Sequence, residues 1–338
     1  MSNLYENDGW VNAAPVVNSK APFVICVGGR GIGKTYSVFK ELLTKQSKPF
    51  IYLRRTQVQI DACKTQELSP FTAVSRDLNI AVDSRAVSKY VAGFYRVEGD
   101  KKNLIAIGIA LSTFSNVRGF DASNYDYIVF DEFIPEKHER PISHEAEAFL
   151  NVLETINRNR ELKGMPPVKT IMLSNANKLD SPILSAIGAL NPLDKMIRKG
   201  NDRATFYNGD LEIFRYTNSP VSAKKKNTAL YRLSSSKDFS DMSLNNSFGE
   251  EAYRNVKSLP IQEFYPLGSI SGITVMRHKS KSIYYVVNGI KSEKLYTLTP
   301  QQQREFCRRT YNSYDAWCKG NVFFATAEAK VKFENIWS

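Results

Sequence analysis

The sequence has few cysteines and histidines and no long apolar run. It contains 4 cysteines and 3 histidines in 338 residues, and because no two cysteines form a C-x-x-C pair, we expect no zinc site. Free thiols in a reducing compartment are the better interpretation. No apolar stretch approaches the ~20 residues of a membrane span, and the start, MSNLYENDGW, has no signal-peptide pattern. We therefore expect a soluble protein of the cytoplasm that is not secreted and does not bind membranes.

Acidic residues are scarce in the last third of the chain. Residues 219–338 contain 18 Lys/Arg and 10 Asp/Glu, a net charge of +8, whereas residues 1–218 contain 28 and 24, a net charge of +4. The excess suggests a polyanionic partner, most simply nucleic acid, and does not separate DNA from RNA. A solvated basic surface explains the same count. The 42% apolar content excludes a disordered or fibrous chain.

Strand and helix patterns alternate over the first two hundred residues. Apolar residues at helical spacing predict helices at 35–43 and 146–156. Continuous apolar runs predict buried strands, and these runs are residues 23–27, 50–53, 104–111, 127–130 and 168–173. Such alternation predicts an α/β domain with a mostly parallel sheet.

The composition changes near residue 219, where a stretch rich in Ser, Lys and Asn begins. Further on, 273–276, 283–287 and 295–298 have strand patterns, and Asn288-Gly289 predicts a hairpin turn between the last two. Residues 300–317 have a helical pattern. We therefore predict three regions: an α/β domain at 1–218, a linker or accessory region at 219–252, and a small α+β domain at 253–338.

The segment GGRGIGKT fits the phosphate-loop pattern G-x-x-x-x-G-K-[ST]. It follows a predicted buried strand and precedes a predicted helix, as the pattern requires. Its glycines let backbone N–H groups converge on phosphate oxygens, and the helix N-terminus adds positive potential. We expect Lys34 to contact the β- and γ-phosphates and Thr35 to bind Mg²⁺, while Arg30 is a phosphate contact or a surface charge. The predicted nucleotide-binding residues are Gly28, Gly29, Arg30, Gly31, Ile32, Gly33, Lys34 and Thr35.

Two acids follow the apolar run 127–130. Hydrolysis of a nucleotide needs one carboxylate for the metal and one for the attacking water. We expect Asp131 to hold Mg²⁺ beside Thr35 and Glu132 to act as the general base. Alone, the pair also fits a strand end capped by solvated acids. The additional glutamate favours a hydrolase over a small-molecule kinase.

Three further segments carry candidate catalytic residues. Asn175 ends the next predicted strand, where it would sense the γ-phosphate or the water; a turn-forming asparagine is equally consistent. Arg158 and Arg160 follow the helix 146–156, and Arg118 precedes the acidic strand. Each is a candidate arginine finger that would stabilise transition-state charge, for Arg158 and Arg160 in a neighbouring subunit. A solvated arginine or a structural ion pair is the alternative for each.

These motifs together resemble a known family, the DNA-packaging ATPases (encapsidation proteins) of phi29-like podophages. The match covers roughly residues 20–250, and the last ninety residues match only in position and general character. The segments that carry it are GGRGIGKTY, FIYLRR at 50–55, VFDEFIPEK at 129–137, NRNRE at 157–161, LSNA at 173–176 and MSLNNSF at 242–248.

The resemblance implies a P-loop ATPase of the additional-strand (ASCE, RecA-like) class, related to terminases. It implies a homo-oligomeric ring, expected to be a pentamer, at the portal (connector) vertex of an empty prohead. That ring would use ATP and Mg²⁺ to move double-stranded DNA inward. A structural packaging RNA docks some relatives to the prohead, and this sequence does not decide whether one is used here.

The resemblance also carries residue roles. Lys34, Thr35, Asp131 and Glu132 match the family's ATP site, and Arg158 matches its trans-acting finger. Arg118 lies where the family has a basic trans residue that is a lysine, so the charge is kept and the geometry is changed.

The resemblance implies a C-terminal domain similar to a ribonuclease-H-like nuclease that has lost its active site. Such nucleases need several carboxylates around two metals, and the strand SGITVMRH contains none. We therefore predict no nuclease activity and a basic nucleic-acid-binding surface, with Lys224–Lys226 as further candidates or simply a solvated run.

Two other classes of function remain open. Another P-loop DNA-dependent ATPase, such as a helicase or an AAA+-like remodeller, would need its own motifs, which we do not find. A non-catalytic nucleotide-gated assembly protein would be free to lose its base, whereas Glu132 is present.

Overall fold

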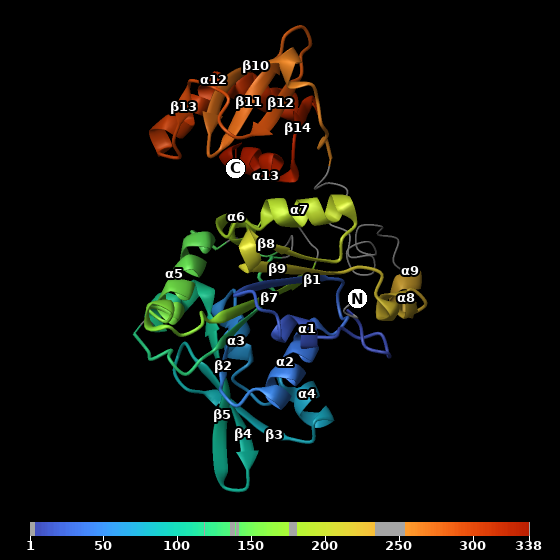
Figure 1. The fold of residues 1–338 in the computed structure, drawn as a ribbon, viewed down its shortest axis with the longest axis vertical. Helices are drawn as coiled ribbons and strands as arrows, with labels where there is room; N and C mark the ends of the chain where they lie inside the picture. The colour runs from blue at the N-terminus through green and yellow to red at the C-terminus, as the bar shows by residue number, and fades with distance from the viewer. Residues whose placement is uncertain are drawn as a thin grey trace. The chain divides into compact units, whose positions relative to one another are not determined.

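The computed structural model describes residues 4–117, 119–135, 139, 142–175, 181–233 and 254–337. These residues divide into two compact units, one of residues 4–187 and 199–233 and the other of residues 188–198 and 254–337. Each unit has its own sheet (Figure 1). No helix in the described ranges is long and apolar enough to cross a bilayer.

The first unit contains a nine-stranded sheet with the order β3-β4-β5-β2-β6-β7-β1-β9-β8. The six strands from β5 to β9 in this order run parallel, and the outer strands β3, β4 and β8 pair antiparallel. The strands are β1 Phe23–Gly28, β2 Phe50–Arg54, β3 Ala81–Ala86, β4 Ala92–Glu98, β5 Lys101–Ala110, β6 Tyr127–Asp131, β7 Lys169–Asn175, β8 Arg203–Phe206 and β9 Leu211–Tyr216. The predicted α/β class, the five predicted strands and the mostly parallel sheet are confirmed.

Helices cover both faces of this sheet because its central strands are apolar on both sides. Residues of α1, α2, α3 and α4 share one core with Val129 of β6. The next residue, Phe130, points to the other face and packs against Phe149 of α5, with ring centroids 5.4 Å apart. In Figure 1, α5 lies apart from α1, α2 and α4. The helices of this unit are α1 Ala14–Val17, α2 Lys34–Lys45, α3 Gln57–Ala62, α4 Thr72–Asp77, α5 Glu145–Asn157, α6 Pro182–Ala186, α8 Pro220–Lys225 and α9 Ala229–Leu233, with short 3₁₀ segments η1 Leu111–Val117, η2 Glu161–Lys163 and η3 Tyr207–Gly209.

The second unit contains a five-stranded mixed sheet with the order β13-β10-β11-β12-β14. Apolar residues of α12 and α13, among them Phe306 and Phe333, pack on one face of it. The elements are α7 Leu190–Lys199, η5 Ile261–Glu263, β10 Phe264–Ile270, β11 Ile273–His278, β12 Tyr284–Asn288, β13 Leu295–Tyr296, α12 Pro300–Cys318, β14 Val322–Phe324 and α13 Ala327–Trp337. The unit is therefore α+β, as predicted, and the helix predicted at 300–317 is confirmed.

The hairpin predicted at Asn288-Gly289 is wrong. Strand β13 pairs in parallel with β10 at the far edge of the sheet, so β12 and β13 are not neighbours. The tight hairpin lies instead at Ser271-Gly272, where both residues have positive φ (50° and 73°) and the flanking Ile270 and Ile273 pair directly. Two positive φ values define a turn whose twist matches that of antiparallel strands. Serine is unusual at such a position, which is why the sequence pointed to the Asn-Gly pair.

Candidate active site

Strand β1 ends at Gly28 and α2 begins at Lys34, so the predicted phosphate loop connects a buried strand to a helix N-terminus. Gly31 and Gly33 have φ of 61° and 89°, which side chains other than glycine rarely adopt. A Cβ at Gly28 would come within 2.8 Å of both Ile32 and Tyr216. The loop therefore requires glycine at these positions for its backbone to curve toward a ligand.

The side chain of Lys34 is buried at the bottom of this loop. Its Nζ donates hydrogen bonds to the carbonyl oxygens of Gly28 and Gly29, at 3.0 and 2.7 Å, and to Oδ1 of Asn175, at 3.1 Å. Burial lowers the pKa of Lys34 to about 8, and the nearby Asp131 carboxylate partly offsets this. A buried ammonium held by neutral oxygens, with the carboxylates of Asp131 and Glu132 nearby, can bind a phosphate anion.

The parallel register brings the polar strand ends to one edge of the sheet. Gly28 pairs with Asn175, and Asp131 with Leu173. Thr35 Oγ1 donates a hydrogen bond of 2.9 Å to Asp131 Oδ1. A hydroxyl and a carboxylate this close supply the hard oxygen ligands that Mg²⁺ prefers, so these residues fit the metal.

A cavity of about 300 Å³ lies between the loop and the strand ends. Glu132, the residue after β6, has a φ of 53°, which turns its side chain away from the strand direction. The cavity is lined by Arg30, Gly31, Gly33, Lys34, Thr35, Tyr36, Asp131, Glu132, Ser174 and Asn175. The structure thus gathers most of the predicted loop residues, both acids and Asn175 around one space.

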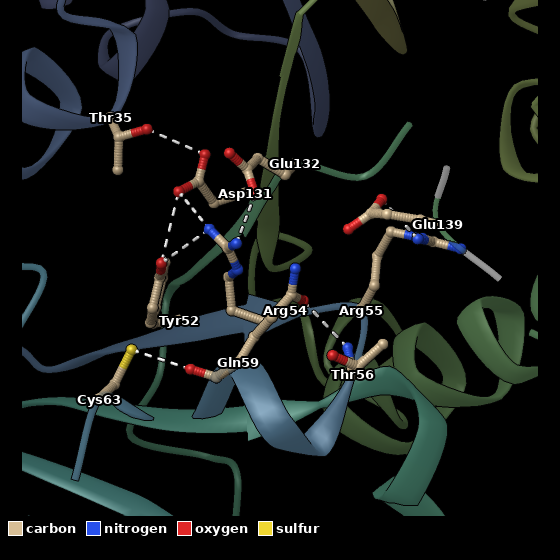
Figure 2. Close-up of polar contacts among 10 residues, drawn as sticks. All are labelled: Thr35, Tyr52, Arg54, Arg55, Thr56, Gln59, Cys63, Asp131, Glu132 and Glu139. Atoms are coloured by element: carbon tan, nitrogen blue, oxygen red, sulfur yellow. Dashed lines mark hydrogen bonds and ion pairs between the residues drawn. The ribbon is translucent and has the colours of Figure 1, made fainter. Parts of the chain in front are cut away.

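Arg54 at the end of β2 bridges the two acids, and the sequence analysis gave it no role. Its Nη1 lies 3.0 Å from Asp131 Oδ2, and its Nη2 forms an ion pair with Glu132 Oε2, as Figure 2 shows. Tyr52, two residues earlier on the same face of β2, donates to Asp131 Oδ2 at 3.4 Å. The motif FIYLRR contains both residues, but only the pairing of β2 with β6 places them beneath the acids.

A second, larger cavity of about 790 Å³ adjoins the first, because Gly33 and Tyr36 line both. Its wall includes the half-exposed ring of Trp10, which would meet a Cβ at Gly33 at 3.0 Å. Asn7 and Asn12 add polar groups. The sequence gave no signal for this wall, because it comes from the segment before β1.

The candidate finger arginines lie elsewhere. At the start of α5, Glu145 forms an ion pair with Arg55, which follows the carboxyl end of β2. At the end of α5, Asn157 accepts a hydrogen bond from the N–H of Val168, which precedes the amino end of β7. Helix α5 therefore runs from the carboxyl edge of the sheet to the amino edge, about 20 Å for its 13 residues. Arg158 follows it, at the edge opposite the cavity.

Arg158 and Arg160 differ in their surroundings. Arg158 is exposed and donates to the carbonyl oxygens of Thr155 and Phe120. Arg160 is buried, donates to three backbone carbonyls and pairs with Asp126 at 2.7 Å. Arg160 is thus held as a structural ion pair, and Arg118 lies outside the described residues.

Solved packaging motors share this fold. The chain superposes on the bacteriophage Phi-29 viral genome packaging motor assembly with a TM-score of 0.69 and 22% identity, covering 99% of both chains. It superposes on the Phi-28 gp11 DNA packaging motor with a TM-score of 0.65 and 18% identity, covering 97% and 96%. At these identities the likeness shows the fold.

Sequence relatives point the same way. The DNA packaging proteins of Bacillus phages phi29 and PZA are each 28% identical to the chain over 226 residues, which are 66% of this chain and 60% of theirs. The matched segment thus spans less than two thirds of their length. The family model for the Podovirus DNA encapsidation protein (Gp16) matches residues 8–335. The resemblance seen in the motifs is therefore confirmed: the chain belongs to the Podovirus DNA encapsidation protein (Gp16) family.

Proposed function

We propose that this protein is the ATPase of a viral genome-packaging motor, which hydrolyses ATP to translocate double-stranded DNA through the portal into the prohead. The observation that carries the proposal is the meeting of the phosphate loop, Asp131 and Glu132 around one cavity, in a chain of a DNA encapsidation family. The motor would act in the host cytoplasm, at the portal vertex during packaging.

The contacts of the cavity residues support a role for five of them. Lys34 would bind the β- and γ-phosphates, and Thr35 with Asp131 would hold Mg²⁺, which would neutralise phosphate charge when bound. Asn175, hydrogen-bonded to Lys34, is positioned beside the terminal phosphate. Glu132 accepts a proton from the attacking water. In the structure this carboxylate is bound to Arg54, so it would leave that ion pair to reach the water.

The adjoining cavity provides the space for the base and ribose. An aromatic ring such as that of Trp10 offers a flat face for stacking an adenine, and the nearby asparagines offer hydrogen bonds to its edge. The phosphates then lie in the smaller cavity, which shares Gly33 with the larger one.

We expect Arg158 to act as a finger arginine at the cavity of another subunit. It is exposed and follows α5 at the amino edge, opposite its own cavity. It therefore suits a trans-acting role in a homo-oligomeric ring, which we expect to be a pentamer. Arg118 is the second candidate for that role, and a packaging RNA is a further partner to test.

The second unit is the proposed nucleic-acid-binding part. We propose an ATPase domain at 1–218, an accessory region at 219–252 and a ribonuclease-H-like domain at 253–338 without nuclease activity. Support comes from a meander of β10, β11 and β12 with β13 parallel to β10.

The first test is steady-state ATP hydrolysis with and without duplex DNA and empty proheads. We expect DNA to stimulate turnover and Glu132→Gln to abolish the stimulation, about a 10²–10⁴-fold loss, while ATP binding persists. Tight ATP binding without turnover in every condition would favour a nucleotide-gated assembly protein. Strand separation would favour a helicase.

The second test is the salt dependence of DNA binding. A motor that follows the backbone should bind through phosphates and ignore sequence, so affinity should fall about tenfold or more over a several-fold rise in salt. A flat salt response would contradict the basic second unit as a DNA surface.

A further inference from the structure

Helix α8 reaches back to the phosphate loop through one lysine. Lys225 Nζ donates hydrogen bonds to the carbonyl oxygens of Arg30 and Gly31, at 2.7 and 2.8 Å. Its neighbours Lys224 and Lys226 are exposed, whereas Lys225 is partly buried. The lysine run that the sequence offered as a nucleic-acid contact therefore contains one residue that is bound to the loop instead.

These two bonds orient the loop backbone. In a trans peptide unit the C=O and the N–H point in opposite directions. A cation that holds the carbonyl groups of Arg30 and Gly31 therefore turns the N–H groups of Gly31 and Ile32 to the other side. Successive N–H groups that point the same way form a concave site for anions. The same cation polarises both peptide units, which strengthens their N–H ends as donors.

The contact depends on the residue at position 31. A Cβ there would come within 2.5 Å of Lys225 Nζ, and Gly31 has a φ of 61°. Glycine thus serves both the curvature of the loop and the approach of the lysine. Burial and, more weakly, the positive charge of Lys225 lower the pKa of Lys34, so the two ammonium groups act on the same space.

Helix α8 lies near the point in the chain where the first unit ends. Helix α8 follows β9, which pairs with β1 beside the loop. Helices α8 and α9 end the first unit in the described residues, and the chain then continues to the second unit. Lys225 therefore joins the phosphate loop to the segment through which the chain leaves the ATPase sheet.

We propose that Lys225 is a positioning residue of the phosphate loop that couples nucleotide binding to the α8–α9 segment. The inference rests on the proposed nucleotide site. Polyphosphate binding tightens the loop around Lys225 and fixes α8, and displacement of α8 releases the two peptide units and weakens nucleotide binding. The coupling is equal in both directions, as thermodynamic linkage requires.

The experiment compares Lys225→Met with Lys224→Met in the full-length chain. Lys224→Met removes the same charge from an exposed position on the same helix. We expect Lys225→Met to weaken binding of ATP and ADP about tenfold, the loss expected for charge-assisted hydrogen bonds. Adenosine, which has no phosphate, should bind equally well to both, and Lys224→Met should stay within twofold of wild type. Lys225→Arg should restore part of the affinity.

A second readout follows the α8–α9 segment directly. ATP should protect the 219–233 segment from limited proteolysis in the wild type and in Lys224→Met, and should not protect it in Lys225→Met. Equal ATP affinity and equal protection in Lys225→Met and Lys224→Met would overturn the inference alone. Failure of the wild-type chain to bind ATP would overturn the proposed function, and this inference with it.

Discussion

At the carboxyl edge of the large sheet, Lys34, Asp131 and Glu132 surround a cavity, whereas at the amino edge Arg160 is buried among carbonyl groups and Arg158 lies exposed. The carboxyl edge is where parallel α/β sheets bind ligands, because the loops there leave the strands in one direction. At the amino edge a cavity of about 550 Å³ is lined by Asn157 and Glu161, the neighbours of the two arginines, and neither Arg158 nor Arg160 is among its lining residues.

The difference between the two edges separates two kinds of charged residue. Groups at the carboxyl edge are partly buried and face one another, as a ligand site requires. Arg160 satisfies its donors internally, whereas Arg158 is exposed and donates to two backbone carbonyls. The proposed trans role of Arg158 would bring one subunit's amino edge to another subunit's carboxyl edge.

The largest effect should come from Arg158→Ala. We expect DNA-stimulated turnover to fall about 10³-fold with ATP affinity nearly unchanged, because a finger acts on transition-state charge. Mixing Arg158→Ala with Glu132→Gln subunits should recover some activity, since each variant supplies what the other lacks. Full assembly of the mixture without recovered turnover would contradict a trans role.

The next effect concerns Arg160, two residues further along the chain. Arg160→Ala removes a buried guanidinium and leaves three carbonyls and Asp126 without it, so we expect a loss of about 2–4 kcal/mol in unfolding free energy. Chemical denaturation measures it. Arg158→Ala is the matched control and should stay within about 0.5 kcal/mol. Equal unfolding free energies for the two variants would contradict a structural role for Arg160 that Arg158 does not share.

The smallest effect is a pH dependence of nucleotide binding. The free site holds the pKa of Lys34 at about 8, and bound phosphate favours the charged form. Below pH 8 the lysine is charged in both states, so affinity is flat. Above pH 8 binding must take up a proton, so affinity falls as pH rises. Titration calorimetry in buffers of different ionisation enthalpy should detect the proton, and no uptake near pH 9 would contradict the assignment.

The site could be predicted only where its residues follow one another in the chain. The phosphate loop and the Asp131-Glu132 pair are local motifs, and residues of both line one cavity in the structure. The contacts of Arg54 could not be predicted from the sequence, because they depend on β2 lying beside β6. The sequence left Lys224–Lys226 open as nucleic-acid contacts or a solvated run, because a lysine run does not show which member contacts the loop.

The fold shows the same limit. Continuous apolar runs predicted buried strands in the large sheet, and residues at helical spacing predicted α2, α5 and α12. Strand pairing depends on tertiary contacts, and the turn at Ser271-Gly272 forms without the residues that usually mark it. The order of the strands in each sheet therefore required the structure.

The place of β9 beside β1 has a consequence for synthesis of the chain. Strand β1 carries the phosphate loop, but its partner Leu211–Tyr216 is made more than 180 residues later. At the usual rates of translation, the edge of β1 that pairs with β9 stays unpaired for roughly 10–40 s. Until then neither Tyr216 nor Lys225 can contact the loop, so the proposed nucleotide site would be complete only after the whole large sheet has emerged from the ribosome.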